Sequence, residues 1–480
     1  MTQTETELVQ LPERPILAPT WEREKRSVQE QIAAGKALRK KVKRSRHAEL
    51  DLPDRDPVAI LEKQHQSRIP ELVPVRVGRM LESPFAYYRG AAANMAYDLA
   101  QGARTGVNVV MSGDAHLANF GMYAAPDRRV VFDLNDFDEA AYGPWEWDLK
   151  RLLTSLVIAG RDQEFPPDTI DEAVRAGARR YREVMADLIS LPILDRYYHR
   201  VEVESLFDIA SDESQKALRK AVRKARNRTS DQALEKITTS HASGRPEIVE
   251  QPPIVRHLDG MVEERIEELK GIWDAYLATV RADQHLLLNQ FELADVAMRV
   301  VGVGSVGTAC FIALFIGPGS EPLFLQVKEA QRSVIYEYGG IPLPDHSVAP
   351  FLDGGHGEGH RVVSGQRILQ ASSDPFLGWV EYKGRAFYWR QFRDMKGSAN
   401  IADMNGNVFI EYAQLCGRIL ARAHSQSPAA ALIWGYMGRG TKFDDAVVKW
   451  SYAYADQVER DYEALQRAVA SGRLRAERGV

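Results

Sequence analysis

Two short polar segments of the chain carry residue types that could transfer a phosphate group. The first runs from Gly113 to Gly121 and contains Asp114 and Asn119. The second follows a few residues later and contains three acidic candidates, Asp133, Asp136 and Asp138. An amide oxygen with a few carboxylates suits Mg²⁺, which proteins usually hold together with nucleotide phosphates. Asp114 precedes Asn119 on the same loop, where it could accept the proton of a hydroxyl nucleophile.

A β-hairpin would bring these two segments together. The alternation around Pro126-Asp127 predicts a hairpin over 120–134, with Phe120 opposite about Asp133. Asn119 and the acidic cluster would then lie at the same end of two neighbouring strands, within reach of one cation. The alternative is a set of plain turn residues, because Asp, Asn and Gly favour turns for local reasons.

A third segment predicts a nucleotide-binding loop. It follows an apolar stretch and contains Gly302, Gly304, Ser305 and Gly307, and a later apolar strand ends in Lys328. Glycines let backbone amides approach an anion, and a lysine at the end of a strand could donate to phosphates. An ordinary hairpin turn is the alternative explanation of the glycines.

These candidate residues require a mixed framework of strands and helices. Hydrophobic periodicity predicts the main helices over 168–189, 261–287, 362–371, 408–424 and 443–470. The same analysis predicts strands over 107–111, 297–303, 308–316, 323–328, 377–382 and 386–392. The order is helical, then β-rich, then helical, which indicates two lobes, one of them assembled from both ends of the chain.

The first loop resembles the catalytic loop of aminoglycoside and choline kinases, which runs Gly-Asp-x-His-x-x-Asn and continues into a hairpin and a metal-binding Asp. The Trp147-Asp148 pair matches the next feature of those kinases. The resemblance implies Asp114 as catalytic base, Asn119 as metal ligand and Asp148 as a brace for the loop. This chain departs from the pattern at Ser112, where those kinases usually have His. The metal-binding Asp is either Asp133 or Asp136, and the Asp136-Phe137-Asp138 sequence favours Asp136.

More closely, the chain resembles a bacterial family catalogued only as domain of unknown function 2252. The shared segments are Ser83-Pro84-Phe85, Tyr88-Arg89-Gly90, 113–121 and 135–139, and the match covers roughly 56–424. The family carries no established substrate. Arg89 in the second motif could bind a phosphate or an acid of the substrate, although pairing with a carboxylate of the protein is the favoured interpretation.

The kinase resemblance implies a circularly permuted order, because the glycine loop and its lysine follow the catalytic loop instead of preceding it. The predicted fold class is therefore α+β, a protein-kinase-like two-lobed fold with a small antiparallel β lobe and a larger helical lobe. In this arrangement helix 362–371 corresponds to the regulatory helix, although the expected Glu partner of Lys328 is not evident. Strand 386–392 leads into the hinge, which adds Gln391 and Phe392 to the nucleotide-binding residues.

The predicted divisions are a peripheral arm (1–55), a helical lobe with the catalytic loop and hairpin (56–290), a β-rich nucleotide-binding lobe (291–396) and closing helices (397–480). The chain would cross between lobes near Phe291 and again near 392–396. The arrangement requires Lys328 to lie within about 15 Å of Asp133 or Asp136, so that one triphosphate and its metal could bridge them.

Composition limits the classes of function. The 480 residues carry a formal net charge of −4 and two cysteines, which gives no overall basic footprint for nucleic acid and no disulfide framework. The absence of an apolar signal core or spanning segment favours a cytoplasmic protein and argues against a membrane protein. The basic run over 36–46 is predicted to be a solvated helix or arm.

The sequence thus predicts an ATP- and Mg²⁺-dependent phosphotransferase that acts on a small hydroxyl- or amine-bearing molecule. Two alternatives stay open at this point: a nucleotide-binding pseudokinase that regulates a partner protein, and a nucleotidyl (AMP) transferase on the same fold. The intact Asp114 and Asn119 count against the pseudokinase.

Overall fold

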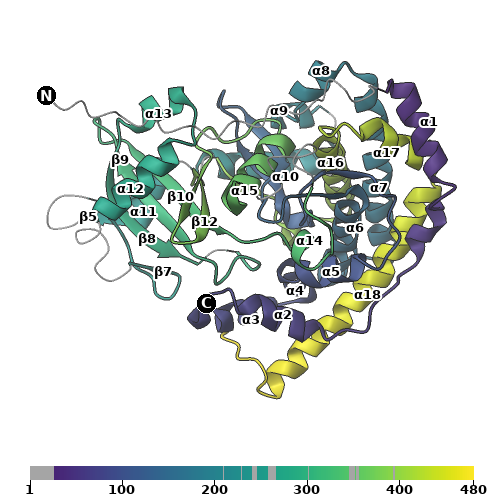
Figure 1. Cartoon of the computed structure of the whole chain (residues 1–480), viewed down its shortest axis with the longest axis horizontal. Coiled ribbons are helices and arrows are strands. Elements are labelled where there is room, and N and C mark those ends of the chain that lie inside the picture. The colour runs from purple at the N-terminus through teal and green to yellow at the C-terminus, as the bar shows by residue number, and fades with distance from the viewer. Residues whose placement is uncertain are drawn as a thin grey trace, which may run out of the picture.

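Strands and helices separate into two regions in the computed structural model (Figure 1). It describes residues 26–208, 210–228, 230–240, 246–257, 266–300, 302–344, 352, 356–392 and 395–479. The protein is of the α+β class, as predicted. A six-stranded sheet with every neighbouring pair antiparallel forms one region, and a bundle of long helices forms the other.

The six-stranded sheet has the order β11-β12-β10-β9-β8-β7. Its strands are β7 (Val255–Arg256), β8 (Glu292–Arg299), β9 (Cys310–Ile316), β10 (Pro322–Ala330), β11 (Gly378–Tyr382) and β12 (Arg385–Gln391). The predicted strands after residue 290 are present with small shifts of their ends. Lys328 lies on β10, which pairs with β9 on one side and β12 on the other, so its backbone is fixed by two neighbours.

Helices from before residue 290 also belong to this region. Tyr276 and Leu288, from α12 (Ile266–Leu277) and α13 (Ala282–Leu288), are buried in one cluster with Val296, Leu325 and Trp389 of the sheet. Helix α11 (Ser230–Ile237) and the β5 (Thr238–Ser240) and β6 (Pro246–Ile248) pair lie beside the sheet as well. The predicted boundary near 290 is therefore too late, because the apolar faces of these short elements cover the sheet rather than the helical bundle.

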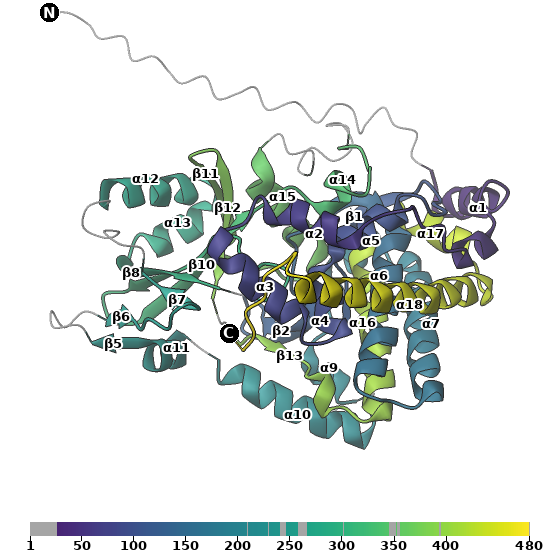
Figure 2. The ribbon, with the colours of Figure 1, turned by 90° about the horizontal axis from the view of Figure 1, so that it is seen from below.

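The helical region is built around four long helices: α6 (Trp145–Asp162), α7 (Pro167–Ser190), α16 (Gly406–His424) and α18 (Lys442–Ala470). Two come from the middle of the chain and two from its end, and their apolar faces form one large core. Figure 2 shows α18 running along one side of this bundle. Shorter members are α8 (Ile193–Tyr198), α9 (Val203–Leu206), α10 (Asp212–Arg226) and α17 (Ala430–Met437). Residues from 145–190 and from 406–470 thus share one core.

Helices α2 to α5 and two small sheets contribute buried residues to the large core of the helical region. The helices are α2 (Pro57–His65), α3 (Val73–Met80), α4 (Pro84–Gly90) and α5 (Ala92–Leu99). One small sheet pairs β1 (Asn108–Met111) with β4 (Ala141–Pro144). The other has the order β13-β2-β3 and contains β2 (Phe120–Ala124), β3 (Val130–Leu134) and β13 (Gly397–Ser398). The β2–β3 hairpin is the predicted one.

The chain crosses between the two regions more often than predicted. After β10 it enters the helical region as α14 (Val334–Glu337), whose Val334 and Ile335 are buried in the large helical core. It then returns through α15 (Gly357–Leu369), which packs against β11 and β12. Strands β10 and β12 are therefore neighbours in the sheet, although between them in the sequence the chain enters the helical region.

The described part of the N-terminal arm is not peripheral. Helix α1 (Val28–Leu38) packs against α17, and Arg39 donates hydrogen bonds to the carbonyl oxygens of Gly435 and Tyr436, while Arg44 donates to that of Met437. Basic side chains at a helix C-terminus satisfy carbonyls that have no partner within the helix. Arg39 and Arg44 are therefore used for packing, while Lys36, Lys40, Lys41, Lys43 and Arg46 of the same run are exposed, as predicted for a solvated helix or arm. Among the described helices, none has the length and apolar character needed to cross a bilayer.

Candidate functional site

The loop that carries Asp114 is fixed from below by a buried carboxylate. Asp148, at the start of α6, accepts hydrogen bonds from the backbone N–H groups of Ser112 (2.7 Å) and Gly113 (2.9 Å). His424, at the end of α16, lies 3.1 Å from the same carboxylate and is fully buried. Gly113 has φ +75°, and a Cβ atom there would lie 2.0 Å from the carbonyl oxygen of Glu139. The predicted bracing position of Asp148 is confirmed, with a histidine from a distant helix as an additional partner.

Asp114 itself faces the space between the two regions. Arg151 of α6 approaches its Oδ1 atom to 2.7 Å, and Asn119 donates a hydrogen bond from Nδ2 to its carbonyl oxygen at 2.7 Å. Burial raises the pKa of Asp114 to about 6, although Arg151 opposes the shift. His116 lies 3.7 Å away, and burial with the nearby guanidinium groups depresses its pKa, so it stays neutral. Asp114 can therefore exchange a proton near neutral pH, as a general base must.

The hairpin separates the three acidic candidates. Gly121 pairs with Asp133 and Phe120 with Leu134, one residue away from the predicted register. Asp133 accepts hydrogen bonds from the backbone N–H groups of Leu134 and Ala371, both 2.9 Å, and is buried on the side of α15. Its assignment as a metal ligand is wrong on this geometry, because side chains alternate along a strand and its carboxylate is already used.

Asp136 and Asp138, just beyond the strand, meet Lys328 across the two regions. The Lys328 Nζ atom lies 3.9 Å from Asp136 Oδ1 and is hydrogen-bonded to Asp138. The distance between Lys328 and Asp136 is therefore below the predicted limit of about 15 Å. Tyr388 of β12 and Ser305 also donate to Asp138, at 2.7 and 3.3 Å. Burial alone would lower the pKa of Lys328, but the two carboxylates raise it, so the ammonium stays charged.

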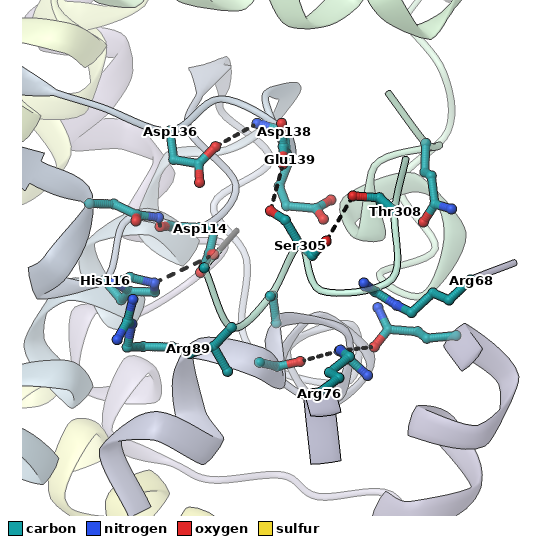
Figure 3. A pocket seen from close by; sticks show the side chains of 18 of the residues that line it. Arg68, Arg76, Arg89, Asp114, His116, Asp136, Asp138, Glu139, Ser305 and Thr308 are labelled. Atoms are coloured by element: carbon teal, nitrogen blue, oxygen red, sulfur yellow. Dashed lines mark hydrogen bonds and ion pairs between the residues drawn. The ribbon is translucent and has the colours of Figure 1, made fainter. Parts of the chain in front are cut away.

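The glycine segment forms a tight loop above this cluster. Gly302 and Gly307 have φ of +65° and +88°, which other residues rarely adopt. Gly302, Gly304 and Ser305 line one cleft together with Asp114, Asn119, Asp136 and Asp138 (Figure 3). Gly307 lies at the foot of the loop, where its carbonyl oxygen accepts a hydrogen bond from the N–H of Ile69 at 2.8 Å. The cleft measures about 820 Å³, including the part that opens to solvent.

Gln391 and Phe392 do not reach this cleft. Gln391 lines a separate, smaller pocket with Arg390 and Lys396. Phe392 packs edge-on against Phe324, and its N–H donates to the carbonyl oxygen of that residue at 2.9 Å. Their assignment as nucleotide-binding residues therefore has no support from the geometry of the cleft.

Helix α15 supplies no carboxylate to Lys328. Its Glu358 is bound to Arg361 of the same helix, and Arg361 donates further hydrogen bonds to the carbonyl oxygens of Asp138, Ala140 and Gln331. Lys328 is hydrogen-bonded to Asp138 instead of to a glutamate of α15. Arg361 thereby fixes the backbone that carries the acidic pair, a role that sequence analysis did not identify.

Three arginines and a glutamate of the cleft were missed or misassigned. Arg68, Arg76, Arg89 and Glu139 all line it. Arg89 was expected to pair with a carboxylate, but among the described residues no carboxylate lies within ion-pair distance of it. Burial raises the pKa of Glu139 to about 7, although the Val334 N–H opposes this. The signal for these residues was weak, since each stands alone in a helical or loop segment.

The oxygen atoms present fit a shared magnesium ion but not a complete metal site. Asn119 uses its amide nitrogen on the Asp114 carbonyl oxygen, which leaves its side-chain oxygen available in the cleft that Asp136 also lines. Within the described ranges, no group of three or more His, Cys, Asp or Glu side chains is placed to hold a metal. Such a sparse set of oxygen ligands suits a cation whose remaining ligands are phosphate oxygens and water.

Comparison with models of known protein families shows to which family the chain belongs. A family described as an uncharacterized protein conserved in bacteria (DUF2252) matches residues 68–468. The chain belongs to this family. The DUF2252 match includes the Asp114 loop, the glycine loop, Lys328 and α16, and all the residues that line the cleft except Gln64. Comparison with the curated proteins and with the solved structures finds no match.

Proposed function

We propose that this protein is an ATP- and Mg²⁺-dependent phosphotransferase with a circularly permuted, kinase-like arrangement of its two regions. The observation that carries the proposal is the meeting of Lys328 with Asp136 and Asp138, beside Asp114 and Asn119 and beneath the glycine loop. Kinases need these parts in one cleft: a glycine loop, a strand lysine, metal-binding oxygens and a base for the acceptor hydroxyl.

The order of the sheet supports the kinase-like arrangement. The glycine loop joins β8 to β9, Lys328 lies on the next strand, β10, and α15 precedes β11 and β12. In protein kinases the glycine loop likewise precedes a third strand that carries the phosphate-binding lysine, and a regulatory helix follows.

The end of α16 supports the permutation. The hydroxyl oxygen of Ser427, just after this helix, accepts a hydrogen bond from the N–H of Val110 at 2.9 Å, although the two residues are 317 positions apart. His424 lies against Asp148 under the Asp114 loop. The helix that resembles the one leading into a kinase catalytic loop thus lies beside that loop without being joined to it.

The proposed roles follow from position and charge. Asp114, with its pKa near 6, accepts the proton of the acceptor hydroxyl or amine as the bond to phosphorus forms. Asn119 and Asp136 would hold Mg²⁺, which when bound neutralises the charge on the phosphates. Lys328 would leave Asp138 to pair with phosphate oxygens. Most of the rate enhancement would come from positioning and charge stabilisation.

Transfer of label from ATP tests the proposal. The protein is incubated with Mg²⁺, a pool of small metabolites and ATP labelled at either the α or the γ phosphate. We expect label from the γ position in a small product and none from the α position. Asp133→Asn is the matched control for Asp136→Asn, because both carboxylates lie on the same hairpin but Asp133 faces away from the cleft. Equal loss in both variants, with both folded, would contradict the assignment.

A pseudokinase is the second candidate. It is favoured by the absence, within described α15, of a carboxylate that contacts Lys328, since Glu358 is bound to Arg361. The same labelling experiment separates the candidates: nucleotide binding without transfer of either label would support the pseudokinase, and transfer of the α label would support nucleotidyl transfer.

A further inference from the structure

We propose that Arg68, Arg76 and Arg89 form a phosphate-binding subsite in the cleft that Asp114 and Asp136 also line. The proposal rests on the proposed function for the identity of the site beside it. The ligand chemistry is a phosphate group, which belongs either to the nucleotide or to a phosphorylated acceptor.

The three arginines come from one run of helices and line the same cleft. Arg68 follows α2, Arg76 lies on α3 and Arg89 lies on α4. Figure 3 shows Arg89 beside His116 and Arg68 beside Thr308 of the glycine-loop segment, with Arg76 between the two arginines along the pocket. Arg76 is fully buried.

None of the three has a carboxylate partner among the described residues. Arg76 donates to the carbonyl oxygen of Gly90 (2.7 Å) and contacts the His65 ring (2.8 Å), while Arg68 donates to the carbonyl oxygen of Val306. These acceptors are neutral. Arg89 makes no hydrogen bond or ion pair within the described chain, and the Nε atoms of all three are buried without a partner. Burying a charge without compensation is costly, so a set of three calls for an anion.

The acidic residues around the cleft do not supply that anion, because each is already engaged. Asp114 is paired with Arg151, Asp136 and Asp138 face Lys328, and Glu329 is paired with Arg385 at 2.6 Å. Glu139 accepts the N–H of Val334, and with its pKa near 7 it carries only part of its charge at neutral pH. Burial lowers the pKa of Arg68 to about 10, and the Glu139, Asp138 and Glu329 carboxylates, none of them in ion-pair contact with it, offset only part of that shift.

The geometry favours phosphate over a simple carboxylate. Arginine forks bind phosphate oxygens in pairs, and three of them can surround one tetrahedral group. The glycine segment lines the same cleft, where glycines let backbone N–H groups approach an anion. The same cleft is lined by Asp114, Asn119 and Asp136, so a phosphate at the arginines would share the cleft with the assigned base and metal-binding oxygens.

Calorimetric titration with inorganic pyrophosphate, in chelator and without nucleotide, tests the subsite. We expect binding to the wild-type protein and about ten- to a hundredfold weaker binding to Arg89→Gln, the loss expected for hydrogen bonds to a charged group. Arg89→Lys should fall between the two. Arg129→Gln, at the exposed tip of the β2–β3 hairpin, is the matched control and should bind as the wild type does.

Folding gives an independent readout. Because Arg89 has no partner in the described chain, Arg89→Gln should melt no earlier than the wild type without ligand, whereas loss of a structural arginine would lower the melting temperature. Absence of pyrophosphate binding to the wild type, undiminished binding to Arg89→Gln, or equal weakening in Arg129→Gln would each overturn the subsite.

Competition with ATP identifies the source of the phosphate. If saturating ATP displaces pyrophosphate, the subsite binds phosphates of the nucleotide; if pyrophosphate binds beside ATP, it binds a phosphorylated acceptor. Both results support the subsite. Its failure is distinct from that of the proposed function, since pyrophosphate can bind where no label is transferred, and label can be transferred where pyrophosphate does not bind.

Discussion

Two buried arginine clusters lie on the same run of helices and are neutralised differently. In the first, Arg55 lies between Asp98 of α5 and Asp461 of α18, at 2.5 and 2.7 Å, and Tyr454 donates to Asp98 at 2.8 Å. We call this set the clamp. In the second, Arg68, Arg76 and Arg89 face the cleft without a carboxylate partner among the described residues.

The pKa values of Arg55 and Arg68 show this difference in how the two clusters are neutralised. Burial lowers the pKa of both Arg55 and Arg68, but hydrogen bonds to Asp98 and Asp461 more than reverse the effect at Arg55, and nothing equivalent does so at Arg68. A cluster that is complete without a ligand can serve only stability, whereas an incomplete one has capacity left for binding. Substitutions in the clamp should therefore change the free energy of unfolding, whereas substitutions in the cleft should change binding or turnover.

Asp114→Asn should give the largest effect, which is a loss of turnover in the cleft. Removing a general base lowers turnover by about 10²–10⁴-fold, while nucleotide affinity should change little because Asp114 is assigned to the acceptor. Single-turnover kinetics and nucleotide titration measure the two quantities separately. Near-normal turnover on the true acceptor would remove Asp114 from its assigned role.

Arg55→Met should give the next largest effect, and on stability alone. Breaking a buried ion pair leaves uncompensated charge and costs about 3–5 kcal/mol, here at Asp98 and Asp461. Urea unfolding measures the loss. Arg473→Gln, which removes an exposed ion pair with Glu62, is the control and should change the unfolding free energy far less. Equal losses in the two variants would show that the clamp is no stronger than a surface pair.

ATP with Mg²⁺ should stabilise the protein by about 2.7 kcal/mol at 100 times the dissociation constant. Asn119 and Asp136 offer too few oxygens for a full magnesium shell, so the nucleotide must complete it. Thermal shift in Mg²⁺ and in chelator measures the difference. If ATP stabilises equally well in both, the metal assignment is wrong; the clamp variant should show the same shift from a lower starting temperature.

Acid pH should give the smallest effect. With a pKa near 6, Asp114 loses its charge below that value, so turnover should fall about tenfold per pH unit below pH 6. The effect of acid on the free energy of unfolding, through the same group, has the opposite sign. The folded protein binds this proton more tightly than the unfolded chain, so acidification from pH 7 to 5 favours folding at this group. Comparing the melting temperatures of wild type and Asp114→Asn at both pH values isolates that contribution.

Sequence patterns predicted most strands and long helices because periodic apolar faces determine them locally, but the predicted helix 261–287 is divided into α12 and α13, and β8 lies four to five residues before the predicted strand 297–303. They also predicted that Lys328 and Asp136 meet, since the motif types indicated one site. The direction of the Asp133 side chain could not be predicted, because a shift of one residue in strand pairing turns a side chain to the other face. The lack of a partner for Arg89 was also beyond the sequence, since pairing depends on which distant carboxylates are already occupied.

The repeated crossings between the two regions have a consequence for dissecting the protein. The strands of the large sheet come from 255–330 and 378–391, and α14 enters the helical core between these two stretches. No single cut in the chain therefore releases the sheet from the bundle as an intact piece. Limited proteolysis within one connection should yield fragments that stay associated under native conditions, and either region expressed as one uninterrupted segment would lack elements that it needs to fold.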